Sequence, residues 1–371
     1  MTPLDAPAAD ALARVQAMVG VPLHEETGEF PVERGYIWTT CSSVENGNPL
    51  FWDDAVAGEI TAGPIAPPTM LSVWFRPHHW APGRESVRLP LQVHFDLKEL
   101  LGLPEAVMTD NTIVFHDPVR VGDVLQTRQI LRSVSEEKTT KLGTGRFWVI
   151  DVEYANQLGE LVGVESYTGF GYIRTDSVGR AEQRPSVASS TGSGGAAEAG
   201  DRSDTERARA HGPDGHTTVF AEVAQGDRVP SLSYDVTTTT VVLGALASRD
   251  WRPMHHDKDF AVNRNGTKDV FMNTPNQAAW FERYVTDWTG PYGRLGRMSF
   301  RMRGSVFPGD TMVFDAVVDD VGIDDVGCGW VGLAITVSVD GDVKTTCDAR
   351  VAIPVDAGDN PWARRSERWQ P

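Results

Sequence analysis

An acid and an imidazole stand close together in residues 250–255, which read Asp-Trp-Arg-Pro-Met-His. Pro253 stiffens the backbone between them, because its ring fixes one of the two rotatable backbone angles of that residue. A carboxylate and an imidazole at this spacing can share one water molecule, which is the least equipment needed to add water to a double bond or to remove it. The run therefore predicts an acid–base site with Asp250 and His255 as its two catalytic groups.

A degenerate copy of this run lies near the N-terminus at residues 46–51, which read Asn-Gly-Asn-Pro-Leu-Phe. Asn46 takes the position of the acid, and Phe51 takes the position of the histidine. Neither an amide nor a phenyl ring exchanges protons near neutral pH. We therefore expect the chemistry to be confined to the second run.

The duplication continues beyond the two runs. Landmarks that recur in the same order predict that the chain consists of two related halves. They are a Gly-Asp turn (119–123 and 306–310), a strand opening at Trp148 and Trp330, a glycine-containing turn (156–160 and 340–342), and a closing strand that ends near Ile173 and Ile353.

The run at 250–255 resembles the Asp-x-Asn-Pro-(Ile/Leu)-His signature of MaoC-like, R-specific enoyl-CoA hydratases, which have a hotdog fold. Arg252 stands where that family has Asn. By resemblance, His255 takes a proton from water, while Asp250 orients that water and serves the proton at C2 of the substrate. The tandem arrangement resembles the double-hotdog hydratase unit of peroxisomal multifunctional enzymes, here with a dehydratase-type N-terminal module. The resemblance covers about 300 residues.

The clearest helix signal follows the second run. Thr274 is predicted to be the N-cap, with Pro275 at the first helical position and Gln277 closing a capping box. The pair Gly290-Pro291 is typical of a helix end. The apolar stripe expected to face the core, at i, i+3, i+4 and i+7, consists of Phe281, Tyr284, Val285 and Trp288.

A counterpart helix is predicted in the first half. We expect it to begin near residues 66–69 and to stop at Pro77, since proline cannot continue a helix. Its apolar stripe would be Met70, Leu71, Trp74 and Phe75.

Long strands are predicted after the helix of the second half. Their apolar, β-branched character gives four segments: 298–307, 312–318, 330–339 and 343–353. The sequence therefore predicts an α+β fold, a tandem (double) hotdog in which each half is a long central helix wrapped by an antiparallel β-sheet.

Composition divides the chain into three parts. Residues 176–218 contain no aromatic residue, Leu or Ile, so this stretch cannot bury enough apolar surface to offset the entropy of ordering it. We therefore predict an N-terminal hotdog domain with an eroded catalytic pair at 10–175, a flexible linker at 176–228, and a C-terminal MaoC-like hotdog domain with the catalytic pair at 229–356.

The resemblance also implies where negative charge would be stabilised. Adding water to an enoyl thioester builds charge on the thioester oxygen, and the N-terminus of a buried helix offers free N–H groups and a favourable dipole. We place this oxyanion hole at residues 272–274, through the backbone of Asn273 and Thr274, although the family usually has a glycine here. Arg252 is open to three interpretations: a salt-bridged surface residue, a contact to a CoA phosphate, or a substitute for the ordering role of the family's Asn.

Charge and cysteine usage exclude several functions. A net charge of −17 argues against binding to nucleic acid and to an anionic membrane. The three cysteines are widely spaced and match no metal-ligand pattern, and the N-terminus lacks the blocks of a signal peptide. Adjacent histidines, such as His255-His256, point in different directions, so no metal is expected. We expect a cytoplasmic protein.

These observations favour a hydro-lyase that adds water to a 2-enoyl-CoA or dehydrates a 3-hydroxyacyl-CoA. The expected partner is an acyl-CoA thioester, and no cofactor is expected beyond the CoA of the substrate. Assembly into a homodimer is possible. One alternative is a hotdog thioesterase, which would need an acid or base facing the thioester from the long helix, a role that Gln277 suits poorly. The other is a non-catalytic acyl-CoA-binding subunit of a hydratase complex, because loss of the pair in the first half shows that such erosion occurs.

Overall fold

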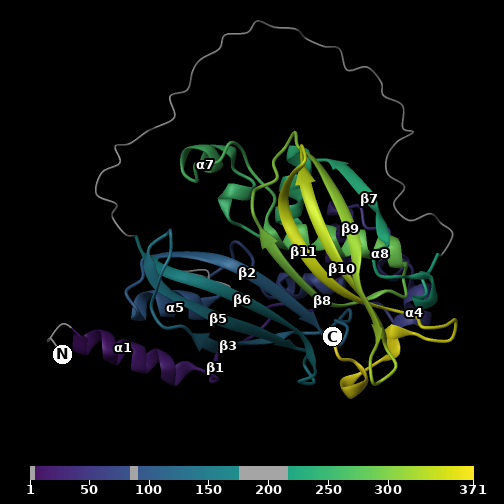
Figure 1. Cartoon of the computed structure of the whole chain (residues 1–371), viewed down its shortest axis with the longest axis horizontal. Helices are drawn as coiled ribbons and strands as arrows, with labels where there is room; N and C mark the ends of the chain where they lie inside the picture. Colours follow the sequence, from purple (N-terminus) through teal and green to yellow (C-terminus); the bar gives the residue numbers. More distant parts are fainter. Residues whose placement is uncertain (1–4, 84–90, 175–215) are drawn as a thin grey trace, which may run out of the picture.

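The computed structural model describes residues 5–83, 91–174 and 216–371, and places their strands in one sheet whose strand pairs are all antiparallel (Figure 1). The strands of the first half are β1 (Pro22–Thr27), β2 (Glu105–Phe115), β3 (Gln126–Val134), β4 (Lys138–Thr139), β5 (Thr144–Ala155) and β6 (Leu161–Ile173). Those of the second half are β7 (Arg228–Asp235), β8 (Arg294–Met302), β9 (Thr311–Ile323), β10 (Gly329–Val339) and β11 (Asp342–Ile353).

Helices precede, connect or follow these strands. In the first half they are α1 (Asp5–Met18), α2 (Arg34–Ser43), α3 (Pro49–Trp52), α4 (Asp54–Thr61), the 3₁₀ helix η1 (Pro68–Phe75) and α5 (Gln92–Leu100). In the second half they are η2 (Phe220–Glu222), α6 (Thr238–Ala247), η3 (Pro253–His255), α7 (Lys258–Asn263), α8 (Thr274–Thr289), η4 (Pro361–Ala363) and η5 (Ser366–Arg368).

The strand order confirms the internal duplication. The sheet runs β1-β3-β5-β6-β2-β8-β11-β10-β9-β7, with β4 beside β5. Counted outward from the central β2–β8 pair, the equivalent strands of the two halves follow in the same order. The Gly-Asp turns precede β3 and β9, and Trp148 and Trp330 lie in the equivalent strands β5 and β10. The predicted tandem hotdog is therefore correct in its repeat and in its antiparallel sheet.

The two halves form one continuous sheet because β2 pairs with β8. Four residue pairs join them, from Asn111 opposite Phe300 to Val114 opposite Arg297. The hydroxyls of Thr112 and Ser299 lie 2.9 Å apart across this seam. Apolar residues from both halves belong to one buried cluster on the concave side, so the halves share a core.

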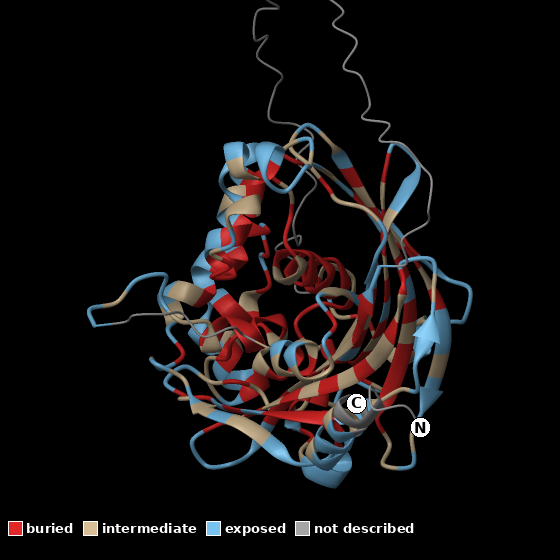
Figure 2. Ribbon diagram, turned by 90° about the vertical axis from the view of Figure 1, so that its left-hand side faces the viewer, coloured by how far each residue is buried: buried red, intermediate tan, exposed pale blue. Residues whose placement is uncertain are grey.

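Helix α8 is the central helix of the second half, and it lies where the sequence predicted. Of the four stripe residues, Phe281, Tyr284 and Val285 are buried, and Trp288 is half-buried. Figure 2 shows buried helical segments enclosed by the curved sheet. The predicted start is wrong by one residue, since the side chain of Asn273 caps the helix through the N–H of Asn276. The predicted capping box is also wrong, because the side-chain oxygen of Gln277 accepts a hydrogen bond from the hydroxyl of Thr345 instead.

The prediction of a long central helix in the first half is wrong. Residues 68–75 form only the 3₁₀ helix η1, which ends with Arg76 as its C-cap. Met70, Leu71 and Trp74 are buried as predicted, but the segment is too short to repeat α8. The apolar spacing at 70–75 is compatible with either kind of helix, and a proline at each end of the segment limits its length.

The proposed domain limits need adjustment at their ends. Most of the predicted linker lies outside the described residues, but residues 216–228 belong to the second half: Thr218 donates to the carbonyl of Trp288, and Phe220 donates to that of Pro354. The tail after residue 356 also packs on the fold. The indole of Trp369 is buried and donates to the carbonyl of Phe115 in the first half at 2.7 Å.

No helix within the described parts of the chain has the length and apolar character needed to cross a lipid bilayer. Cys41, Cys328 and Cys347 are all buried as free thiols.

Candidate active site

The loop that carries the predicted acid and base leaves the C-terminus of α6. Asp250 donates its N–H to the carbonyl of Ala245, and Arg249 adopts a left-handed backbone with φ of 52°. The side chain of Asp250 then accepts from the N–H of Arg252, which turns the chain toward Pro253. Pro253 opens η3, the short helix that ends with His255. The sequence thus folds the run into a compact turn rather than an extended loop.

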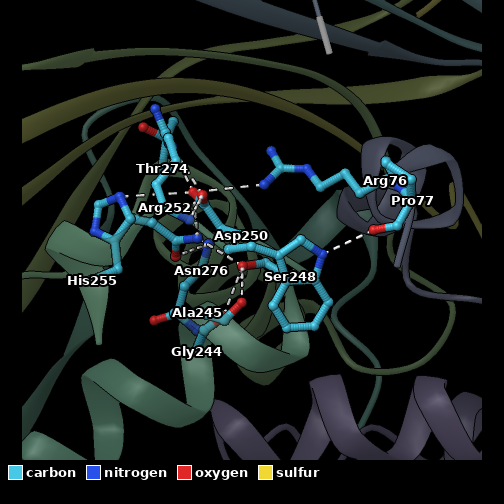
Figure 3. A network of polar contacts seen from close by, with 12 residues as sticks. Arg76, Pro77, Gly244, Ala245, Ser248, Asp250, Arg252, His255, Thr274 and Asn276 are labelled. Atoms are coloured by element: carbon cyan, nitrogen blue, oxygen red, sulfur yellow. Dashed lines mark hydrogen bonds and ion pairs between the residues drawn. The ribbon is translucent and has the colours of Figure 1, made fainter. Parts of the chain in front are cut away.

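Asp250 and His255 are brought together, as the sequence predicted. Their side chains are 3 % and 4 % exposed, and Nε2 of His255 lies 3.7 Å from Oδ2 of Asp250 (Figure 3). This separation is too long for a direct hydrogen bond. The two atoms can instead contact one water or hydroxyl oxygen placed between them.

The carboxylate of Asp250 is held by cations and an amide. Arg252 donates to both of its oxygens, at 2.8 and 2.7 Å, and Asn273 donates through Nδ2 at 3.0 Å. Nη1 of Arg76 lies 3.6 Å from Oδ2. Burial alone raises the pKa of Asp250, but the hydrogen bonds from Arg252 and the charge of Arg76 outweigh it and hold this pKa well below its usual range. The group is therefore a carboxylate near neutral pH.

His255 is arranged as a neutral base. Its Nδ1 lies 2.8 Å from the carbonyl oxygen of Phe271, so this nitrogen carries the hydrogen and Nε2 keeps its lone pair toward Asp250. Burial lowers the pKa of His255 below its ordinary value, although the charge of Asp250 opposes this effect in part. A buried neutral imidazole with its lone pair beside a carboxylate is suited to accept a proton.

The start of α8 lies beside this pair, because its N-cap residue, Asn273, contacts Asp250. Asn273 is buried, and its side chain bonds to both Ser248 and Asp250, which ties the helix to the loop. The N–H of Met272 donates to the carbonyl of Val306 and is therefore occupied. The N–H groups of Asn273 and Thr274 find no acceptor among the described residues, so they remain available to a ligand.

The first half also contributes to this site, which the sequence analysis missed. Arg76 reaches Asp250 from the end of η1. The loop is fixed to the same segment by two bonds: Nε of Arg249 donates to the carbonyl of Arg76 at 2.9 Å, and the indole of Trp251 donates to that of Pro77 at 2.8 Å. No short motif marks Arg76, and only the pairing of the two halves brings it to the site.

Comparison with known proteins places the chain in a family. Residues 17–164 match the model of the FAS1-like dehydratase domain region. A stretch of 89 residues is 37% identical to the beta subunit of 3-oxo-4,17-pregnadiene-20-carboxyl-CoA hydratase of Mycobacterium tuberculosis, and covers 24% of this chain and 68% of that protein. The chain belongs to the MaoC-like hotdog family of hydratases and dehydratases.

One further relative and two solved structures are also similar to the chain. A probable enoyl-CoA hydratase alpha subunit of Thermomonospora curvata is 29% identical over 184 residues, which cover 46% of this chain and 54% of that protein. A MaoC-like dehydratase of known structure has a TM-score of 0.62 at 19% identity, with 92% of this chain and 100% of that one covered. A Mycobacterium tuberculosis protein described as a double hotdog has a TM-score of 0.53 at 16% identity, with coverage of 88% and 96%. These two structures show the fold.

The degenerate run of this MaoC-like chain has a structural role. The side chain of Asn46 accepts from the N–H of Asn48, and Asn48 in turn caps α3 through the N–H of Leu50. Phe51 is buried in the shared core. The residues at 46–51 thus form a turn equivalent to 250–255 without a proton-transfer group.

Proposed function

We propose that the chain is an acyl-CoA hydro-lyase that adds water to a 2-enoyl-CoA, or removes it from a 3-hydroxyacyl-CoA, with Asp250 and His255 as the acid–base pair. The observation that carries the proposal is the 3.7 Å separation of Asp250 and His255 beside the free N–H groups at the start of α8. Membership in the MaoC-like family supports the reaction class.

In the hydration direction, Nε2 of His255 accepts a proton from water while the water oxygen forms a bond to C3. The π electrons of the C2=C3 double bond form a C1=C2 bond, and the π electrons of the carbonyl group move onto the thioester oxygen, which gives an enolate. The N–H groups of Asn273 and Thr274 would donate to that oxygen, assisted by the dipole of α8. His255 then passes the proton that it accepted to Asp250, and Asp250 donates it to C2. The enolate returns to the thioester in this step. Dehydration follows the same steps in reverse, and neither direction needs an electron carrier or a metal.

Arg252 has to be accommodated in this scheme. It occupies both oxygens of Asp250, yet its side chain is 60 % exposed. A carboxylate held in this way cannot pass on a proton, so the scheme requires Arg252 to leave at least one oxygen when substrate binds. A CoA phosphate is a suitable competing anion, because guanidinium groups pair with phosphate as well as with carboxylate.

The same contact favours a second candidate, a non-catalytic acyl-CoA-binding subunit. If Arg252 never releases Asp250, the pair cannot turn over. The relatives from Mycobacterium tuberculosis and Thermomonospora curvata are described as beta and alpha subunits, which supports testing the chain with and without a partner. The thioesterase alternative finds less support, since Gln277 bonds to Thr345 on β11.

One assay on the purified chain separates these candidates. A series of 2-enoyl-CoA esters with short, long and ring-bearing acyl groups is followed by loss of the enoyl-thioester absorbance, by release of free thiol, and by binding. Hydration supports the proposal, and thiol release would indicate a thioesterase. Saturable binding without turnover of any ester would indicate the subunit. The variant His255→Ala serves as the control for background hydration.

A further inference from the structure

Among the described residues of the first half, Arg76 is the cation that lies against Asp250. It follows the last residue of η1, and its side chain is 15 % exposed. Its backbone is held by Arg249 through the carbonyl of Arg76, and the next carbonyl, that of Pro77, is held by Trp251. Both donors flank Asp250 in sequence, so the segment and the catalytic loop are docked to each other at two points.

Arg76 also acts electrostatically on a buried carboxyl group of the first half, Glu165. Glu165 on β6 is buried and accepts from the hydroxyls of Tyr154 and Tyr167. Burial raises the pKa of Glu165, and the charge of Arg76 opposes that rise. Nε of Arg76 is buried without a hydrogen-bond partner among the described residues. The charge of Arg76 thus acts on two buried carboxyl groups, one from each half.

The two arginines at Asp250 differ in how firmly they are placed. Arg252 is 60 % exposed on a long flexible side chain, whereas Arg76 is 15 % exposed and its backbone is docked to the loop. We infer that Arg76 is a positioning residue for the acid–base pair, the fixed counter-charge that keeps Asp250 ionised and in place while Arg252 moves away. The inference rests on the proposed function, because it gives Asp250 a catalytic role.

The physical reason is the cost of burying a carboxylate. The groups that face Asp250 are Arg76 at the end of η1, Arg252 in its own loop, His255 in η3, and the amide of Asn273 at the start of α8. One cation within about 4–6 Å lowers a carboxyl pKa by roughly one to three pH units, and desolvation raises it. With either arginine present, Asp250 stays ionised at neutral pH. With neither guanidinium, burial is opposed by the amide of Asn273 and by the backbone N–H of residue 252, neither of which carries a charge.

The test is a comparison of four proteins: the wild type, Arg76→Met, Arg252→Met and the double variant. The pH dependence of kcat/KM is measured from pH 4 to 9. In the double variant the pKa of Asp250 rises, so activity is lost as pH falls through a value roughly one to three units higher than in Arg252→Met. Arg76→Lys in the Arg252→Met background should return the profile toward that of the single variant. The double variant of Arg252→Met with Arg120→Met is the matched control, because Arg120 bonds within the first half to Thr61.

The inference is overturned if kcat/KM of the double variant falls at the same acid pH as that of Arg252→Met. It is also overturned if the Arg120 control shifts this pH as far as the Arg76 double variant does. If the methionine double variant does not fold, Arg76→Gln replaces Arg76→Met with the same expectation. A wild type without hydration activity counts against the proposed function instead. The carboxyl carbon signal of Asp250, assigned by Asp250→Asn, then follows its titration directly and tests the role of Arg76 without turnover.

Discussion

Glu282 offers a prediction whose size follows from the structure. It lies on α8, is 1 % exposed, and accepts from the N–H and the hydroxyl of Thr69 at the start of η1, at 3.0 and 2.5 Å. Its other oxygen, Oε1, is buried without a partner among the described residues. Burial raises the pKa of Glu282 from 4.5 to about 7, and the two bonds from Thr69 limit the rise. Below about pH 7 this carboxyl therefore joins the halves in its protonated form.

The effect on stability follows from proton linkage. In the unfolded chain Glu282 ionises near its ordinary pKa of 4.5, whereas in the folded chain it ionises near 7. Stability from this group is fully present below pH 4.5 and is lost as pH rises through about 7, at about 1.4 kcal/mol per pH unit between the two values. Between pH 5 and pH 8 the wild type should lose about 2.5 kcal/mol from this source. Glu282→Gln cannot ionise, and its carbonyl oxygen still accepts from Thr69.

The assay is chemical denaturation of the wild type and of Glu282→Gln at several values from pH 5 to pH 8. The difference in the free energy of unfolding between the two proteins should change in favour of the variant by about 2.5 kcal/mol over this range. Glu59→Gln, at an exposed position of α4, is the matched control and should show a constant difference. A constant difference for Glu282→Gln as well would refute the reasoning, because it would mean that Glu282 does not titrate in this range.

Three further predictions concern the site. If Arg252 moves to a CoA phosphate, Arg252→Ala should raise KM for a CoA ester and change KM little for a pantetheine thioester. An equal fall in kcat for both substrates would mean instead that Arg252 orders Asp250 throughout the reaction. Asn46→Ala should leave kcat within a few-fold, since its side chain only shapes a turn; a loss as complete as that in His255→Ala would place chemistry in the first half. The lowered pKa of His255 means that the required neutral imidazole persists to lower pH than usual, so the acid-side midpoint of kcat/KM should lie below 6.5, the ordinary pKa of histidine. A midpoint above pH 6.5 would contradict this assignment.

The sequence predicted those features that short-range patterns encode. The run at 250–255 placed Asp250 and His255 together, because a proline turn and a short helix set their separation locally. The repeated landmarks predicted the duplication, since each lies in a strand or in a turn close to one. The strand predicted at 298–307 starts four residues too late, because β8 begins at Arg294 with three consecutive buried residues that show no alternation.

The remaining features depend on contacts between residues far apart in the chain. Arg76 lies 174 positions before Asp250, and Thr69 lies 213 positions before Glu282. Nothing near either residue distinguishes it from a surface arginine or a helix-cap threonine. The short helix η1 could not be predicted for a similar reason. The spacing of its apolar residues fits an α-helix equally well, and its packing beneath the sheet depends on distant residues.

The central claim is that Asp250 and His255 carry out proton transfer to and from an acyl-CoA substrate. The most direct measurement is the turnover of folded Asp250→Asn and His255→Ala with the best 2-enoyl-CoA, beside two matched controls at exposed positions, Asp259→Asn and His256→Ala. Each site variant should lose roughly 100- to 10,000-fold in kcat, the usual contribution of a positioned acid or base, while the controls stay near the wild type. Near-normal turnover in either site variant, with its fold verified, would contradict the account.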